Sequence, residues 1–212
     1  MLAAPAAASV PPDRLVSSAL AAARAQRSVH YVTAAVSSTV NIRMVCDAAL
    51  DRGIQRITYV KAGKSGHVTV LVVANTAYVR GDAFVLANYM GFSGAAARRF
   101  AGRWIKIPHT APGYPTVSAA VRLRSTIKEL ALPRPLVALP ESMLNGQRVI
   151  GIRNTSMASG HRVTNTLYVR AAGLRLPVAE VTRGGGNRFS VTFSKWNQPV
   201  NVSAPTGATL IR

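Results

Sequence analysis

The sequence has one cysteine, seven acidic residues and four histidines among 212 residues, and each shortage limits its chemistry. A lone Cys46 excludes an internal disulfide and a thiolate metal cluster. The acidic residues form no closely spaced pair suited to acid–base catalysis, the histidines are too scattered for a zinc signature, and no G-x-S-x-G motif is present. Although distant residues can converge in a fold, we expect a non-enzymatic protein without a metal or a cofactor. The residues concerned are Asp13, Asp47, Asp51, Asp82, Glu129, Glu141, Glu180, His30, His67, His109 and His161.

No apolar run approaches the roughly 20 residues of a membrane-spanning helix, although 49% of the residues are hydrophobic. We therefore expect a soluble chain, long enough for one large β-rich domain or two small ones. Residues 1–12 are small and proline-rich, and Ala6 to Ala8 before Ser9 fit a signal-peptidase site that lacks a charged region and an apolar core before it. We predict a disordered tail or leader remnant over residues 1–12, with the leader apparently absent, and a single domain over residues 13–212.

Charge of one sign dominates, with 26 Lys and Arg, 21 of them Arg, and a formal net charge of +19. Such a balance indicates an anionic partner, and nucleic acid, anionic lipid or an acidic wall polymer would each satisfy it. The basic residues are scattered along the chain rather than gathered in a tail or a lysine-rich run. An arginine- and alanine-rich coding bias on a solvated surface explains the same composition, so both interpretations stay open.

Hydrophobic periodicity predicts strands, then helices, then strands again. Asp13 is a good N-cap for a helix that reaches about Gln26. Alternation around Cys46 predicts a half-buried strand whose thiol faces the core and is inert. Further strands are expected at residues 28–32, 54–60, 67–74, 76–80, 104–107, 149–153, 163–171, 176–182 and 188–193, and helices at 83–91, 93–102 and 116–132.

Two stretches need separate comment. Residues 61–66, KAGKSG, suggest a phosphate loop, but they lack its first glycine and precede a strand rather than a helix, which argues against a nucleotide site. Residues 189–205, FSVTFSKWNQPVNVSAP, alternate apolar and hydroxyl side chains, break at residues 195–199, and resume at Val200 and Val202. This predicts the last two strands of an antiparallel sheet, with Trp196 at the corner.

The same C-terminal stretch, SKW followed by PVNVSAP, resembles the end of the LppX/LprG family of actinobacterial envelope lipoproteins, which are related in fold to the lipoprotein carrier LolA. Residues 15–30, LVSSALAAARAQRSVH, are similar to the opening helix of that family, and residues 144–152, LNGQRVIGI, are similar to its NGQ turn. The three motifs occur in the family's order. The family often carries a lipid on a cysteine after its leader, and the position of Cys46 departs from that pattern.

The order of elements predicts an α+β fold: a single curved antiparallel sheet, or half-barrel, with helices packed on its concave face. The aromatic residues of the helical middle then either fill that face as core or leave a gap for acyl chains. Members of the family with this layout shelter lipids there, so the resemblance implies a lipid site. The expected lining residues are Val70, Val72, Tyr78, Phe84, Tyr89, Met90, Phe92, Phe100, Trp104, Val121 and Ile127.

We accordingly expect an exported lipid or lipoglycan carrier of the bacterial cell envelope, or a secreted one. An anionic head group would be held by Arg98, Arg99, Arg103 and Lys106. An anionic membrane surface or wall polymer is a further expected partner, ahead of nucleic acid. The alternatives are a basic protein with a filled core that binds anionic polymers, and an accessory module that binds another protein.

Overall fold

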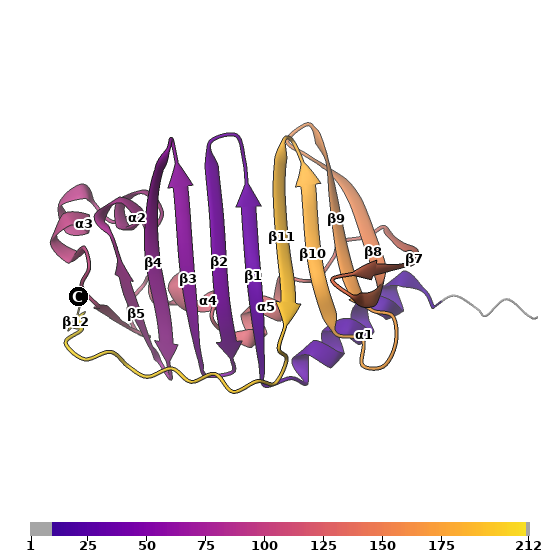
Figure 1. Ribbon diagram of the computed structural model, residues 1–212, viewed down its shortest axis with the longest axis horizontal. Helices are drawn as coiled ribbons and strands as arrows, with labels where there is room; N and C mark the ends of the chain where they lie inside the picture. Colours follow the sequence, from indigo (N-terminus) through magenta and orange to yellow (C-terminus); the bar gives the residue numbers. More distant parts are fainter. Residues whose placement is uncertain (1–9, 211–212) are drawn as a thin grey trace, which may run out of the picture.

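The computed structural model describes residues 10–210, which form one curved, unclosed 12-stranded sheet with helices on one side (Figure 1). The strand order is β12-β6-β5-β4-β3-β2-β1-β11-β10-β9-β8-β7. Neighbouring strands are antiparallel, apart from the short β12, which pairs with β6 in parallel. The predicted α+β half-barrel is therefore confirmed, with this one parallel pair as a correction.

The strands are β1 (Ser28–Val36), β2 (Val40–Ala49), β3 (Arg52–Lys61), β4 (Lys64–Val73), β5 (Thr76–Gly81), β6 (Ile105–Pro108), β7 (Leu136–Leu144), β8 (Gln147–Ala158), β9 (His161–Arg170), β10 (Pro177–Gly184), β11 (Asn187–Ser194) and β12 (Thr209–Leu210). The helices are α1 (Pro12–Arg24), α2 (Ala83–Asn88), α3 (Gly94–Phe100), α4 (Tyr114–Ala119) and α5 (Leu123–Lys128). Within residues 10–210, no helix has the length and apolar character needed to cross a membrane.

Tight hairpins keep sequential strands adjacent. In the KAGKSG stretch the strands extend to Lys61 and from Lys64, and only Ala62 and Gly63 form the turn, with φ of 49° and 73°. Two successive positive φ values match the right-handed twist of the flanking strands. The stretch is thus a hairpin turn rather than a phosphate-binding loop.

The first helix packs its apolar face against one end of the sheet, where α1 contacts β7, β8 and β10. Leu15, Val16 and Ala19 are buried on this face. The prediction that Asp13 caps the helix is wrong, because the helix begins at Pro12, whose fixed φ suits the first turn. Asp13 instead accepts a hydrogen bond from Arg134 Nε at 2.8 Å. Of the predicted tail, residues 1–9 lie outside the described residues.

The helical middle follows the prediction for α2 and α3, but the single helix expected over residues 116–132 is wrong. The chain forms α4 and α5 instead, because Arg122 has an extended backbone, with φ −109° and ψ 122°, and makes a parallel β-bridge to Ala49. Beside the break, the Ala120 carbonyl accepts hydrogen bonds from the Tyr31 hydroxyl and the Cys46 thiol. The sheet thus holds the junction between α4 and α5, residues 120–122.

Two features at the ends of the sheet were not predicted. Strand β7 follows Pro133 and Pro135, and prolines weaken a strand pattern because they remove a ladder donor. The prediction of a strand at Val200 and Val202 is wrong. Positive φ values at Lys195 and Asn197 turn the chain away from the sheet before this point. Residues 195–208 instead form a strap along the lower end of the sheet, which leads to β12 beside β6 (Figure 1).

The contact between the junction and the sheet yields a stability prediction. A Cβ on Gly53 would overlap the Val121 carbonyl oxygen and lie 2.9 Å from its Cβ. We expect Gly53→Ala to lower the free energy of unfolding in urea by about 3 kcal/mol, because buried backbone must move. Gly113→Ala is the control, since that Cβ meets nothing within 4 Å and the φ of −77° suits alanine. Equal unfolding midpoints for the two variants would contradict the described packing.

Candidate functional site

The concave face carries a groove with two adjacent compartments, a lower one of about 420 Å³ and an upper one of about 410 Å³. Phe189 lines both compartments and is 37% exposed, so it lies at the boundary between them. Both lie over the central strands β2, β1, β11 and β10. This pair of compartments, called the concave groove below, is the candidate site.

Strand register builds the floor of the groove from one residue per strand. Thr33 faces Met44 on one side and Val191 on the other, and Val191 faces Glu180. Because side chains two residues apart share a face of a strand, the row above contains Phe189. The row of Met44, Thr33, Val191 and Glu180 is the floor of the lower compartment. The row that contains Phe189 separates the two compartments.

Residues of the helical middle cover the lower compartment. Thr116 and Ala119 come from α4, Ala120 from the junction, and Ser125 and Thr126 from α5. Leu130, Val191, Phe193 and Tyr31 add buried apolar surface. The anchoring of the Ala120 carbonyl to β1 and β2 therefore sets the height of this roof above the floor.

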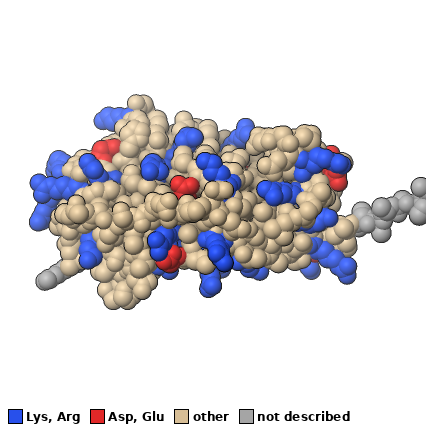
Figure 2. All heavy atoms as spheres, turned by 60° about the horizontal axis from the view of Figure 1, so that its bottom comes forward, with Lys and Arg blue, Asp and Glu red and all other residues tan. Residues whose placement is uncertain are grey.

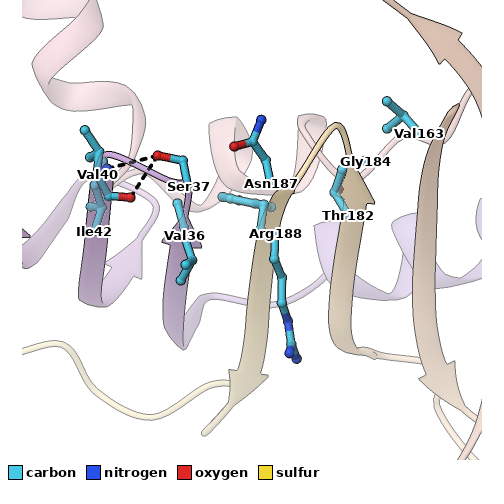
Figure 3. Close-up of a pocket in the computed structure, with 11 residues that line it drawn as sticks. Val36, Ser37, Val40, Ile42, Val163, Thr182, Gly184, Asn187 and Arg188 are labelled. Atoms are coloured by element: carbon cyan, nitrogen blue, oxygen red, sulfur yellow. Dashed lines mark hydrogen bonds between the residues drawn. The ribbon is translucent and has the colours of Figure 1, made fainter. Parts of the chain in front are cut away.

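The upper compartment lies by the hairpin ends of β1, β2, β10 and β11 (Figure 3). Val40, Ile42 and Val163 line it, and the Ser37 hydroxyl bonds within its own turn, to the carbonyl and the amide of Val40. The Arg188 side chain extends away from the other labelled side chains (Figure 3). The upper compartment is therefore mainly apolar.

Glu180 is the least expected residue of the lower compartment. Burial, with a smaller contribution from the nearby Glu129 carboxylate, raises its pKa to about 7. Leu167 and Val191 lie opposite it on the neighbouring strands. The ion pairs of residues 10–210 use other carboxylates, those of Asp13, Asp47, Asp51 and Glu141.

Cys46 is fully buried, as the strand alternation predicted. Burial raises the pKa of its thiol to about 12, and burial also raises the pKa of Tyr31. Both side chains point at the Ala120 carbonyl. They stay protonated at neutral pH, and their role is to hold the junction rather than to react.

The predicted lining residues lie outside the groove, mostly in the other half of the concave face. Val70, Val72, Val121 and Ile127 are buried in the core. Phe84, Tyr89, Met90, Phe92 and Phe100 are partly buried against that core. The rings of Phe84 and Tyr89 lie 5.9 and 5.4 Å from that of Tyr59, so this half of the face is filled.

Tyr78 and Trp104 lie on the opposite side of the sheet. Tyr78 stands between Ala77 and Val79, which both face the concave core, so its side chain leaves the convex face. Trp104 is covered by Arg80, whose guanidinium lies 6.0 Å from its ring. Neither side chain reaches the concave side.

The four predicted head-group residues are exposed at the β6 end of the sheet. Arg98 and Arg99 end α3, Arg103 follows it, and Lys106 is on β6. Strands β5 to β1 and strand β11 separate this end from Glu180 on β10. Basic side chains are spread over the face shown in Figure 2, with few acidic ones between them.

Sequence reasoning missed the polar floor of the groove, Thr33, Gln55 and Glu180. The sequence pattern that could have revealed this floor is a polar side chain at an inward position of an alternating strand. Gln55, between Ile54 and Arg56, is an example. Between Val10 and Leu210, no cluster of three His, Cys, Asp or Glu side chains could hold a metal ion.

No protein-family model matches the sequence. No curated protein matches it either. Two solved structures share its fold. One is LprF from Mycobacterium bovis, with a TM-score of 0.63 and 15% identity over 92% of this chain and 97% of that chain. The other is the lipoprotein LppX from Mycobacterium tuberculosis, with a TM-score of 0.55 and 16% identity over 90% of this chain and 99% of that chain. The resemblance that the sequence motifs indicated is thus confirmed in the fold.

Glu180 gives a pH-dependent prediction. Because folding raises its pKa from 4.5 to about 7, its contribution to stability is full below pH 4.5 and is lost as the pH rises through 7. Glu180→Gln should therefore raise the free energy of unfolding at pH 8 by about 2 kcal/mol, a value discounted for partial exposure, and leave it unchanged at pH 4.

Urea unfolding of the variant and the parent at both pH values measures this difference. Glu141→Gln is the control, since Glu141 is exposed and pairs with Arg148 on the neighbouring strand. A gain at pH 8 that equals the gain at pH 4 would contradict a half-buried, proton-binding Glu180.

Proposed function

We propose that this protein is a non-enzymatic lipid-binding or carrier protein of the bacterial cell envelope, whose acyl chains lie in the concave groove. The observation that carries the proposal is the pair of adjacent compartments on the concave face, the lower one under the α4–α5 roof and the upper one at the hairpin ends. Each compartment falls in the size range of small-molecule sites, roughly 300–1,000 Å³. The apolar lining described above suits hydrocarbon.

Burial of hydrocarbon supplies the driving force. Each CH₂ removed from water contributes about 0.8 kcal/mol, less the cost of any opening of the roof. An acyl chain that passes Phe189 would use both compartments. Its polar end, or the sugar of a lipoglycan, would then remain near solvent.

The envelope location is supported by the shared fold, since LppX is described as a lipoprotein. We propose that the protein is exported and works outside the cytoplasm. Its basic surface would hold it against an anionic membrane or wall polymer, with Arg98, Arg99, Arg103 and Lys106 as the basic end of the sheet. The alternative function, a basic protein that binds anionic polymers, requires a filled core. Only the α2–α3 half of the concave face is filled in this way.

Filling the lower compartment tests the site. We expect Ala119→Trp to reduce binding of 1-monolauroylglycerol at least fivefold, because the indole would occupy the space under α4. Native mass spectrometry of the protein titrated with this lipid gives the bound fraction. Ala95→Trp on α3 is the matched control, since Ala95 is an exposed helical alanine that lines neither compartment. Equal binding by both variants, or none by the parent protein, would overturn the proposal.

Removing the divider tests the continuity of the two compartments. We expect Phe189→Ala to prefer longer acyl chains, because the chain could then pass from one compartment to the other. The ratio of the affinity for 18-carbon monoacylglycerol to that for 12-carbon monoacylglycerol should rise at least about fourfold, which corresponds to one additional buried CH₂. Competition between the two lipids in native mass spectrometry measures the ratio. An unchanged ratio would show that the compartments are separate sites.

A further inference from the structure

We propose that the lower compartment selects lipids whose polar end donates hydrogen bonds and carries no negative charge, with Glu129 and Glu180 as the residues that determine this specificity. The inference rests on the proposed function, because it states which lipids the groove accepts. It differs from the expectation that arginines hold an anionic head group, because the arginines concerned lie outside this compartment.

The two carboxylates line the same compartment from opposite sides. Glu180 comes from the floor on β10, and Glu129 follows α5 in the roof. Because both side chains line this one compartment, a ligand that fills it lies next to both. The ion pairs formed among residues 10–210 leave both carboxylates without a basic partner. In a chain of net charge +19, the interior of this compartment is thus locally acidic.

Further polar groups on the floor support a polar ligand end. Gln55 and Thr33 are each 4% exposed, and both line the compartment. Among residues 10–210, the Gln55 amide donates to the Met44 sulfur, at 3.4 Å, and a thioether is a weak acceptor. A buried amide with such a partner retains capacity for a better one. A ligand hydroxyl near Gln55 would supply it, because a hydroxyl both donates and accepts.

The chemistry of the ligand follows from these groups. Above pH 7, where Glu180 is ionised, its carboxylate only accepts hydrogen bonds, so a hydroxyl or a protonated amine satisfies it. A carboxylate or phosphate would meet like charge beside the half-buried Glu180, where repulsion is screened less than in bulk water. Acyl chains can lie along Phe189 and Val191 while the polar end reaches Glu180, because these three residues occupy neighbouring positions on β11 and β10.

Three 12-carbon probes with different polar ends test the inference: 1-monolauroylglycerol, dodecylamine and laurate. Native mass spectrometry or calorimetry is run at pH 8, above the pKa of Glu180, below the micelle concentrations of the probes and with enough salt to screen the basic surface. We expect the glycerol ester and the amine to bind at least tenfold more tightly than laurate. In Glu129→Gln/Glu180→Gln, laurate should gain at least tenfold, and the amine should lose its advantage.

Glu141→Gln is the control, since this exposed carboxylate lines neither compartment, and it should keep the parent's order of probes. Glu129→Gln alone should also raise the affinity for laurate. Because Glu129 lies at the exposed rim, this single variant keeps the test valid if the double variant misfolds. Tight binding of all three probes without preference, or a preference that survives both substitutions, would overturn this inference and leave the proposed function standing. Binding of none of the probes by the parent protein would overturn both.

Discussion

The Ala120 carbonyl is the point on which the arrangement of the concave face depends. It accepts hydrogen bonds from the Tyr31 hydroxyl and the Cys46 thiol, which come from adjacent strands. A helix that continued through residues 120–122 would use this carbonyl for its own backbone bond. Two sheet donors and the close approach of Gly53 to Val121 replace that bond. The chain therefore crosses the sheet as two short helices, which roof a space instead of filling it.

The two halves of the concave face follow from different side-chain volumes. Under α2 and α3, Phe84 and Tyr89 pack around Tyr59 and leave a filled core. Under α4 and α5, the roof contributes Thr116, Ala119 and Ser125, which are too small to reach the floor. A roof of small side chains over the central strands is what leaves the lower compartment open on one half of a single sheet. Basic side chains outside and carboxylates inside then give the two surfaces opposite electrostatic character.

Much of this fold could be predicted from the sequence, because alternation and turn residues act locally. Strands such as β4, with valines at every second position, are recognised by their period, and the break between α2 and α3 is marked by Gly91. The break between α4 and α5 could not be predicted, since it depends on donors about 75 to 90 residues away in the sequence. The concave groove could not be located from the sequence for a related reason. The large aromatic residues that the sequence shows clearly lie in the α2–α3 half, whereas the groove lies where small residues from distant segments face each other, and no local pattern reports that.

The parallel strand β12 has a consequence for the edges of the sheet. An edge strand presents unpaired backbone groups that another chain can extend. At one end of this sheet, Thr209 and Leu210 pair with Ile105 and Lys106, so the edge of β6 is covered by the chain's own C-terminal segment. At the other end, β7 contains Pro140 and a register irregularity between Ala138 and Glu141, which interrupts a regular ladder. A very short edge strand at one end and an interrupted one at the other are two of the devices that disfavour edge-to-edge pairing in a sheet that does not close.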